Sequence, residues 1–135
     1  MIKTIRFFTV IFSLFLFYNS QAQIWKKQAK SGNAGLLDVA FISKSTGFVL
    51  SSGKVLKTTD TGKTWNQILS GYNRFSRIQF TNDSIGYIIG YDDLVLRTTD
   101  GGSNWTLKQT GNSDDDLVTL FAKNKDTLFV AGPDN

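Results

Sequence analysis

Cysteine, histidine and glutamate are all absent from this chain, and its single Met is the first residue. Without Cys there is no disulfide framework, and without Cys or His the usual thiolate and imidazole metal sites are excluded. The lack of His excludes Ser-His-Asp and Cys-His nucleophiles built from this chain alone. The lack of Glu excludes Tyr–Glu and Glu–Glu catalytic pairs. We therefore predict no catalytic residues, no metal site and no cofactor.

What the chain does contain favours β-structure. Its 135 residues suffice for one ordinary domain. It has 12 Gly and 13% aromatic residues, with many Thr, Val and Ile, and this composition favours strands and turns. The absence of Glu and the scarcity of Ala leave few good helix formers. An all-β fold is therefore expected.

The first 22 residues have the pattern of a bacterial secretory signal peptide. A head containing Lys3 and Arg6 precedes an almost wholly apolar run at 7–18, and the small residues Ser20 and Ala22 end the segment. The run is shorter than the roughly 20 residues of a spanning helix, so no stable membrane span is expected. We predict signal peptide 1–22, cleavage after Ala22, and a secreted mature chain that is periplasmic, cell-surface or extracellular.

Cleavage would also change the charge balance of the chain. The net charge of +4 falls to +2 once Lys3 and Arg6 are removed. This excess of positive charge is too small to indicate binding to nucleic acid, and no nucleic-acid partner is predicted.

The mature chain, 23–135, contains an internal repeat. Its tryptophans stand 40 residues apart, at Trp25, Trp65 and Trp105. The segments 54–65 and 94–105 are alike, and a partial third copy follows. We align that third copy on Phe121, in the place that Phe41 and Phe80 hold in the first two.

Each full period reads as four short strands separated by turn residues. The predicted strands are Leu37–Ile42, Gly47–Ser51, Lys54–Thr59 and Thr64–Leu69, then Arg77–Thr81, Ile85–Tyr91, Leu94–Thr99 and Asn104–Gln109. Four strands in about 40 residues are typical of a β-propeller blade. A β-sandwich with similar hairpins is the alternative, and it does not account for the tryptophan period.

The predicted architecture is a partial β-propeller of about 2.75 four-stranded blades. Segments 36–71 and 75–111 are blades, and 117–135 is an incomplete blade. Segment 24–32 resembles the fourth strand of the other repeats, so it reads as the outer strand of a closing blade. A ring of 6–8 blades needs on the order of 240–320 residues. We therefore expect an open arc, an incomplete ring that is a fragment of a larger propeller.

The repeated segment also matches a known motif. Thr58-Thr59-Asp60-Thr61-Gly62-Lys63-Thr64-Trp65 resembles the Asp-box of bacterial neuraminidase repeats, Ser/Thr-x-Asp-x-Gly-x-Thr-Trp. Thr98 to Trp105 resembles it as well, with Asn104 in place of the usual Ser or Thr. The surrounding pattern resembles the photosystem II assembly and stability factor-like branch. The resemblance implies a propeller with a non-enzymatic assembly role. Because sialidases, sortilin-like receptors and xyloglucan hydrolases share the box, the motif indicates the blade more than the function.

The physical role expected of the box is local. A short Asp carboxylate accepts backbone N–H groups of its own turn, and Gly62 and Gly102 provide positive φ. We predict a structural role for every residue of the two boxes: Thr58, Asp60, Gly62, Thr64 and Trp65, then Thr98, Asp100, Gly102 and Trp105.

The opposite face of the propeller is the predicted binding face. Turns between second and third strands, and connections between blades, gather there. The candidate binding residues are Tyr72, Arg74, Tyr91, Asp92, Asp93, Asp114, Asp115 and Asp116. Aromatic, basic and acidic side chains together suit recognition of a polar ligand.

Three functions compete for this face. The first is a secreted, non-enzymatic module that binds a protein or carbohydrate partner not identified by the sequence. The second is a fragment of a sialidase-like or xyloglucanase-like glycoside hydrolase, in which Asp92 or Asp93 pairs with one of Asp114–Asp116 as acid and base. The third is calcium binding by Asp114–Asp116, for which consecutive Asp residues are a weak signal because they lack EF-hand spacing. We favour the first, because runs of Asp in loops are usually turn formers exposed to solvent.

Overall fold

A computed structural model of the protein describes residues 35–72, 74–108 and 115–133. These residues form strands and turns, and no helix occurs among them. The first sheet contains β1 (Leu36–Phe41), β2 (Gly47–Ser51), β3 (Lys54–Thr58) and β4 (Asn66–Ser70). The second contains β5 (Phe75–Phe80), β6 (Gly86–Gly90), β7 (Val95–Thr98) and β8 (Thr106–Leu107). The third contains β9 (Thr119–Ala122) and β10 (Leu128–Ala131).

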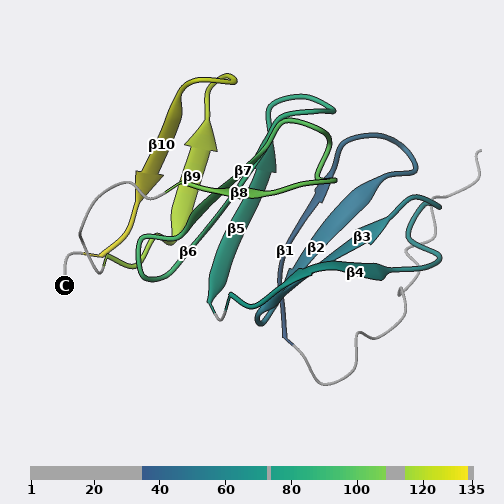
Figure 1. The fold of residues 1–135 in the computed structure, drawn as a ribbon, viewed down its shortest axis with the longest axis horizontal. Coiled ribbons are helices and arrows are strands. Elements are labelled where there is room, and N and C mark those ends of the chain that lie inside the picture. Colours follow the sequence, from purple (N-terminus) through teal and green to yellow (C-terminus); the bar gives the residue numbers. More distant parts are fainter. Residues whose placement is uncertain (1–34, 73, 109–114, 134–135) are drawn as a thin grey trace, which may run out of the picture.

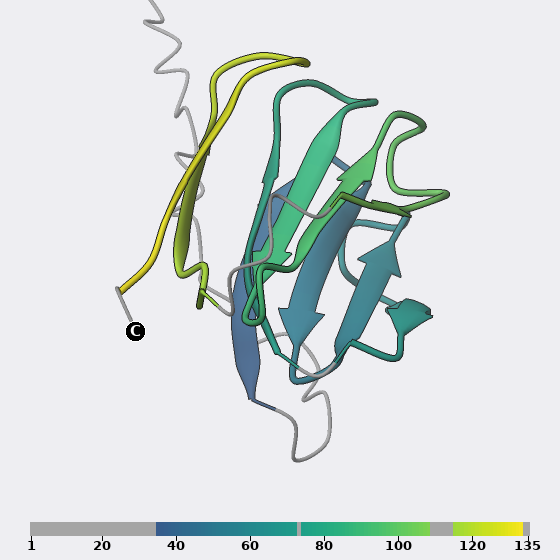
Figure 2. The same cartoon turned by 60° about the vertical axis from the view of Figure 1, so that its left-hand side comes forward.

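The sheets are antiparallel meanders placed side by side. The first two run in the orders β1-β2-β3-β4 and β5-β6-β7-β8, and β9 pairs with β10. Their first strands are neighbours, since β5 contacts both β1 and β9. The third sheet lies at one end of the row and the first sheet at the other (Figures 1 and 2). The prediction of an all-β, open, partial propeller is therefore confirmed. The predicted signal peptide 1–22 and the outer strand 24–32 lie outside the described residues.

The hydrophobic core lies between the sheets. Phe48, Leu50 and Val55 of the first sheet pack against a buried set in the second, which consists of Phe75, Ile78, Ile88, Leu94 and Leu96. A second cluster joins Ile89 and Val95 to Leu117, which precedes the third sheet. Each sheet therefore depends on its neighbour to bury its apolar face.

The second strands are the most deeply buried elements. Every residue of β2 and β6 is buried, because each strand has sheet neighbours on both edges and packing on its faces. The strands begin with Gly because a ring lies against the backbone there. A Cβ on Gly86 would come within 2.6 Å of the Phe80 ring, and Phe80 is its cross-strand partner.

The pairing of strands in the third sheet shows that the predicted alignment of the third repeat is wrong by one residue. Ala122 pairs with Leu128, as Phe80 pairs with Gly86 in the second sheet and Phe41 with Gly47 in the first. Ala122 therefore takes the place we had predicted for Phe121. The large residue and its small partner have exchanged strands, which keeps the pair's combined volume similar. Because side chains alternate along a strand, the one-residue difference places Phe121 on the opposite face.

Candidate functional site

The Asp-box turns join the third and fourth strands of each complete sheet. In the first box, the Asp60 carboxylate accepts the Thr64 backbone N–H at 2.9 and 3.1 Å and the Thr64 hydroxyl at 2.7 Å. The hydroxyl of Thr58, a buried side chain at the end of β3, donates to Asp60 at 2.8 Å and accepts the Gly62 N–H at 3.0 Å. Because Thr64 and Trp65 complete this turn, β4 begins at Asn66, two residues later than predicted.

The second box repeats this network with one substitution. The Thr98 hydroxyl donates to Asp100 at 2.8 Å and accepts the Gly102 N–H at 3.0 Å. Asp100 accepts the backbone N–H groups of Ser103 and Asn104 at 3.0 and 2.8 Å. The Asn104 side-chain amide donates to Asp100 at 2.7 Å. This bond replaces the one that the Thr64 hydroxyl donates to Asp60 in the first box.

These hydrogen bonds hold both carboxylates in the charged form. The backbone N–H of Thr64, followed by its hydroxyl and that of Thr58, lowers the pKa of Asp60 from 3.8 to about 2. The backbone N–H and side-chain amide of Asn104, with the Thr98 hydroxyl, do the same to Asp100. A carboxylate with so low a pKa is a poor proton donor near neutral pH. The observed hydrogen-bond partners of each carboxylate lie in its own turn.

The two box tryptophans differ in their surroundings. Both rings are half-buried. The indole N–H of Trp65 donates to the Gly62 carbonyl at 3.1 Å. The indole nitrogen of Trp105 is buried without a hydrogen-bond partner among the described residues. Trp105 instead lies edge-on to Phe48 of the first sheet, with centroids 6.5 Å apart. The second box is thus part of the joint between the blades.

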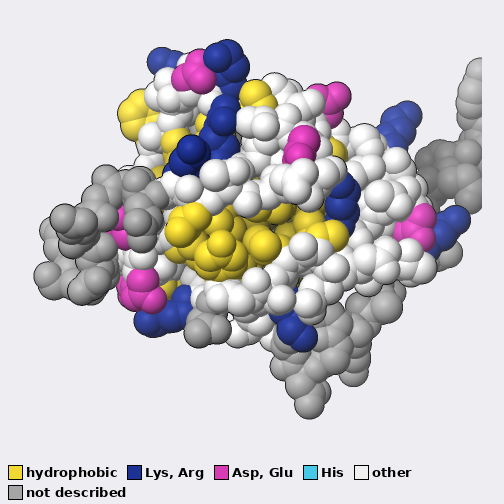
Figure 3. Space-filling view, viewed as in Figure 1, with side chains coloured by type: hydrophobic (Ala, Val, Ile, Leu, Met, Phe, Trp, Pro, Cys, Tyr) yellow, Lys and Arg dark blue, Asp and Glu magenta, His cyan; other side chains and the backbone are white. Residues whose placement is uncertain are grey.

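A cavity of about 270 Å³ opens on the opposite side of the sheets, and we call it the Tyr91 cavity. It is lined by Gly71, Tyr72, Arg74, Tyr91, Asp92, Asp93, Leu94 and Leu107. Five of the candidate binding residues therefore line one cavity: Tyr72, Arg74, Tyr91, Asp92 and Asp93. Leu94 and Leu107 were missed by the sequence analysis, because a Leu in a predicted strand reads as core. In the space-filling view, an apolar patch lies mid-face over the second sheet (Figure 3).

The cavity is shaped by a tight turn between β6 and β7. Asp92 and Asp93 both have φ of 55°, and the Leu94 N–H donates to the Tyr91 carbonyl at 3.2 Å. Two consecutive positive φ values are characteristic of a type I′ hairpin turn, in which Asp is tolerated. The backbone of Arg74 fixes this turn from the preceding connection, because its carbonyl accepts the Tyr91 N–H at 2.9 Å. The Arg74 guanidinium lies over the Tyr91 ring, 4.2 Å from its centroid.

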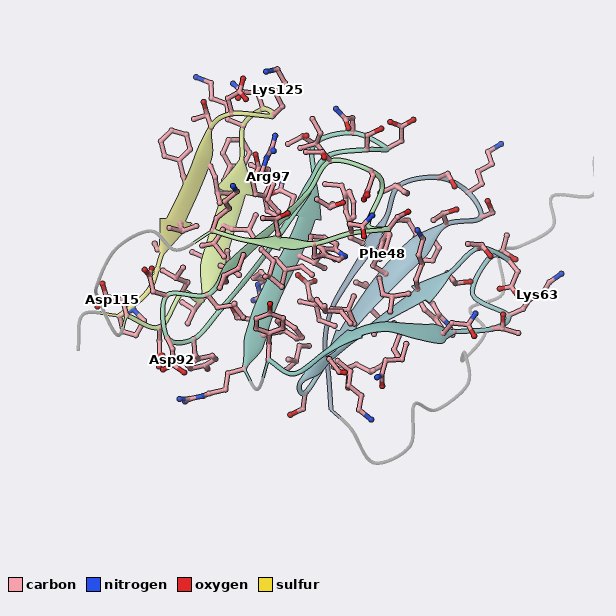
Figure 4. All side chains as sticks on the ribbon, viewed as in Figure 1. Phe48, Lys63, Asp92, Arg97, Asp115 and Lys125 are labelled. Carbon is pink, nitrogen blue, oxygen red and sulfur yellow. The ribbon has the colours of Figure 1, made fainter. Side chains whose placement is uncertain are left out.

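The later acidic residues approach the same turn through the backbone. The Asp93 N–H donates to the Asp115 carbonyl at 2.9 Å, and the Asp93 side chain is buried. Asp92 and Asp115 lie near each other at the lower left of the molecule (Figure 4). Asp114 lies outside the described residues. Neither Asp115 nor Asp116 lines the Tyr91 cavity.

The described residues lack two other classes of functional feature. They contain no group of three or more His, Cys, Asp or Glu side chains placed to hold a metal ion. In residues 35–133, leaving aside 73 and 109–114, no helix is long and apolar enough to cross a membrane.

Known proteins are similar to this chain in sequence and in the arrangement of their sheets. The family described as "Photosynthesis system II assembly factor YCF48" matches residues 18–113 of the chain. The chain belongs to the YCF48 family. Two curated relatives illustrate the likeness. "Photosystem II assembly lipoprotein Ycf48" of Synechococcus sp. (strain CC9902) is 35% identical over 88 residues, which are 61% of this chain and 26% of the relative. "Photosystem II stability/assembly factor HCF136, chloroplastic" of Arabidopsis thaliana is 41% identical over 80 residues, which are 52% of this chain and 20% of the relative.

Solved YCF48 structures have the same fold. YCF48 from Cyanidioschyzon merolae superposes with a TM-score of 0.66 at 27% identity, over 80% of this chain and 34% of that one. "YCF48 bound to D1 peptide" superposes with a TM-score of 0.63 at 24% identity, over 73% of this chain and 34% of that one, which shows the shared fold alone. The chain spans between 17% and 26% of the length of the curated relatives that it matches.

Proposed function

We propose that this YCF48-family chain is an extracytoplasmic, non-enzymatic binding module that takes a protein partner into the Tyr91 cavity. One observation carries the proposal: the cavity joins a guanidinium, two tyrosine rings, an exposed Asp carboxylate and two leucines within about 270 Å³. Aromatic rings and Arg are the side chains most enriched at protein interfaces. The apolar walls of such a site bury part of a ligand, and its few polar groups fix the ligand's orientation.

The geometry favours a polypeptide ligand. Stacking on Tyr91 holds the planar Arg74 guanidinium in place and leaves its N–H groups to donate to carbonyl or carboxylate oxygens. The exposed Asp92 carboxylate, two residues from the end of β6, supplies an acceptor for a backbone or side-chain N–H. A relative that binds a D1 peptide and others named as photosystem II assembly factors support a polypeptide as the partner.

Binding of overlapping peptides that cover the D1 sequence tests this proposal, measured by fluorescence anisotropy. We expect at least one peptide to bind, and Arg74→Ala to weaken its affinity about tenfold or more through loss of charge-assisted hydrogen bonds. Arg77→Ala is the matched control, because Arg77 is an exposed Arg of β5 outside the cavity. Equal losses in both variants would mean nonspecific charge attraction. Failure of every peptide to bind would remove D1 as the partner.

The hydrolase alternative needs its own assay. Turnover of chromogenic glycosides that Asp92→Asn abolishes would favour the acid–base pair over a binding module. We expect no turnover above background, and unchanged peptide binding in Asp115→Asn, since Asp115 lies outside the cavity.

A further inference from the structure

The outer strand of the second sheet, β8, has a free edge beside the Tyr91 cavity. Leu107 pairs with Leu96 and Thr106 with Arg97, so β8 has a neighbouring strand, β7, on one side only. The side chain of Leu107 is 44% exposed and lines the cavity. In the shared view of Figures 1 and 3, the apolar patch of this sheet lies next to β8. The strand edge and the cavity thus form one continuous surface.

The backbone groups of Leu107 point away from β7. The next residue, Lys108, donates its N–H to the Val95 carbonyl at 2.7 Å. In an antiparallel pair, successive residues direct their backbone groups alternately toward and away from the partner strand. The N–H and C=O of Leu107 therefore face outward, and within the described part of the chain neither group has a hydrogen-bond partner. Unpaired groups on a strand edge are a template for another strand.

The hydrogen bonds on the other side of β7 agree with this orientation. Gly90 at the end of β6 donates its N–H to the Leu94 carbonyl at 3.0 Å. By the same alternation, Leu96 directs its backbone groups toward its β6 partner, Ile88. The backbone groups of Leu96 are therefore used within the sheet, and those of Leu107 remain for a strand added from outside.

This edge belongs to a complete four-stranded sheet. The cavity beside it is lined by β8, the turn between β6 and β7, and the connection that follows β4, so it lies between the two complete sheets. The outer strand of the first sheet has a comparable edge, where Gln67 pairs with Leu56 as Leu107 pairs with Leu96. Gln67 does not line the cavity. Of these two outer strands, β8 alone combines a free edge with a pocket.

We propose that the partner binds by strand addition: an extended polypeptide segment pairs with the free edge of β8 and inserts one apolar side chain into the Tyr91 cavity. This inference rests on the proposed function and gives its mode of binding. An extended backbone supplies both an acceptor and a donor to Leu107. The cross-strand neighbour of Leu107 shares its face of the sheet, so that neighbour's side chain enters the cavity. Leu94 and Leu107 favour an apolar side chain there, and about 270 Å³ is below the roughly 300–1,000 Å³ of small-molecule pockets.

Amide hydrogen exchange in the free chain tests the edge without any ligand. The protection factor of Leu107 should be at least tenfold lower than that of Lys108, because the Lys108 N–H is bonded to Val95 and the Leu107 N–H faces solvent. Saturation with a D1 peptide that binds should raise the protection of Leu107 about tenfold or more. Strong protection of Leu107 in the free chain would overturn strand addition and leave the proposed function standing.

Two variants at Leu107 separate the backbone from the side chain. Leu107→Pro removes the outward N–H together with the Leu side chain, whereas Leu107→Ala removes the larger side chain alone. Pro is tolerated on an edge strand where the missing N–H faces solvent. By fluorescence anisotropy, Leu107→Pro should bind the tightest of the overlapping D1 peptides at least tenfold more weakly than Leu107→Ala does. Gln67→Pro is the matched control on β4 and should bind like the unaltered chain. Equal affinities of the two Leu107 variants, or an equal loss in Gln67→Pro, would overturn the proposal.

Modified peptides test the same geometry with the protein unaltered. N-methylation of one peptide residue should weaken binding tenfold or more, and N-methylation of either chain neighbour should not, because successive N–H groups of an added strand face opposite directions. Equal loss at every position, or loss at none, would overturn strand addition alone, since the peptide would still bind. If no D1 peptide binds, the proposed D1 partner and its addition to β8 are both overturned.

Discussion

The ring of Phe48 stacks on the ring of Phe80, with centroids 4.8 Å apart and planes inclined by 24°. The two side chains belong to different sheets, so this pair ties one blade to the next. Lys57 reinforces the joint, because its ammonium group lies 5.2 Å from the Phe48 ring centroid and donates to the Gly101 carbonyl at 3.0 Å. Cohesion between blades thus depends on an aromatic insertion beside the second Asp-box.

Phe48→Ala should therefore destabilise the chain strongly. Removing a fully buried Phe from a packed joint costs about 3–5 kcal/mol. Urea denaturation followed by circular dichroism measures the change. Phe129→Ala is the control at the equivalent but exposed position of the third sheet, and its effect in dilute protein should stay within about 0.5 kcal/mol. Similar losses in both variants would contradict the interlocking of the blades.

Thr98→Val should weaken the second Asp-box without changing its shape. The substitution removes a hydroxyl that donates to Asp100 and accepts the Gly102 N–H. Gly102 is buried, so its N–H loses a partner that water does not readily replace. An unsatisfied buried donor costs about 1–3 kcal/mol, so the free energy of unfolding should fall by that amount. Thr99→Val, at the exposed neighbouring residue, should have little effect. An unchanged melting temperature for Thr98→Val would argue against the hydrogen-bonded box.

The two box carboxylates should make stability depend on pH in acid. Their pKa values are lowered to about 2 in the folded chain, below the 3.8 of an ordinary Asp. Their stabilising contribution is therefore fully present above pH 4 and is lost as the pH falls toward 2. Thermal melts between pH 2 and 7 should show this loss, and the Asp60→Asn/Asp100→Asn double variant should show a shallower slope over the same interval. Parallel curves for the two proteins would refute the assignment.

Export should leave Gln23 as the first residue of the mature chain. The basic head, the apolar run and the small residues before Gln23 predict cleavage after Ala22. Mass spectrometry of protein recovered outside the cytoplasm should identify an N-terminal peptide that begins at Gln23, with or without cyclisation of that residue. Replacing Ala22 with a bulky residue, as in Ala22→Phe, should block processing. A cytoplasmic product that retains Met1 would contradict the prediction.

Local sequence alone determined the blade and its turns. Each Asp-box is closed by hydrogen bonds among residues at most four apart, such as Asp60 and Thr64, so its geometry follows from a short segment. The alternation of strands with turn residues likewise gave the meander order. The type I′ turn at Asp92–Asp93 belongs to the same local class, although the sequence did not reveal how Arg74 packs on it.

Tertiary structure decided how the repeats fit together. Phe121 and Ala122 are adjacent in the sequence, and either is a reasonable match to Phe80. Only the pairing of Ala122 with Leu128 shows which one faces the second sheet. The same holds for the Tyr91 cavity, which Leu107 and Tyr72 both line although they are far apart in the chain. Contacts between blades depend on register and on which face is covered. Side chains alternate between the two faces of a strand. When both faces are apolar, the strand's own sequence specifies neither its register nor which face is covered.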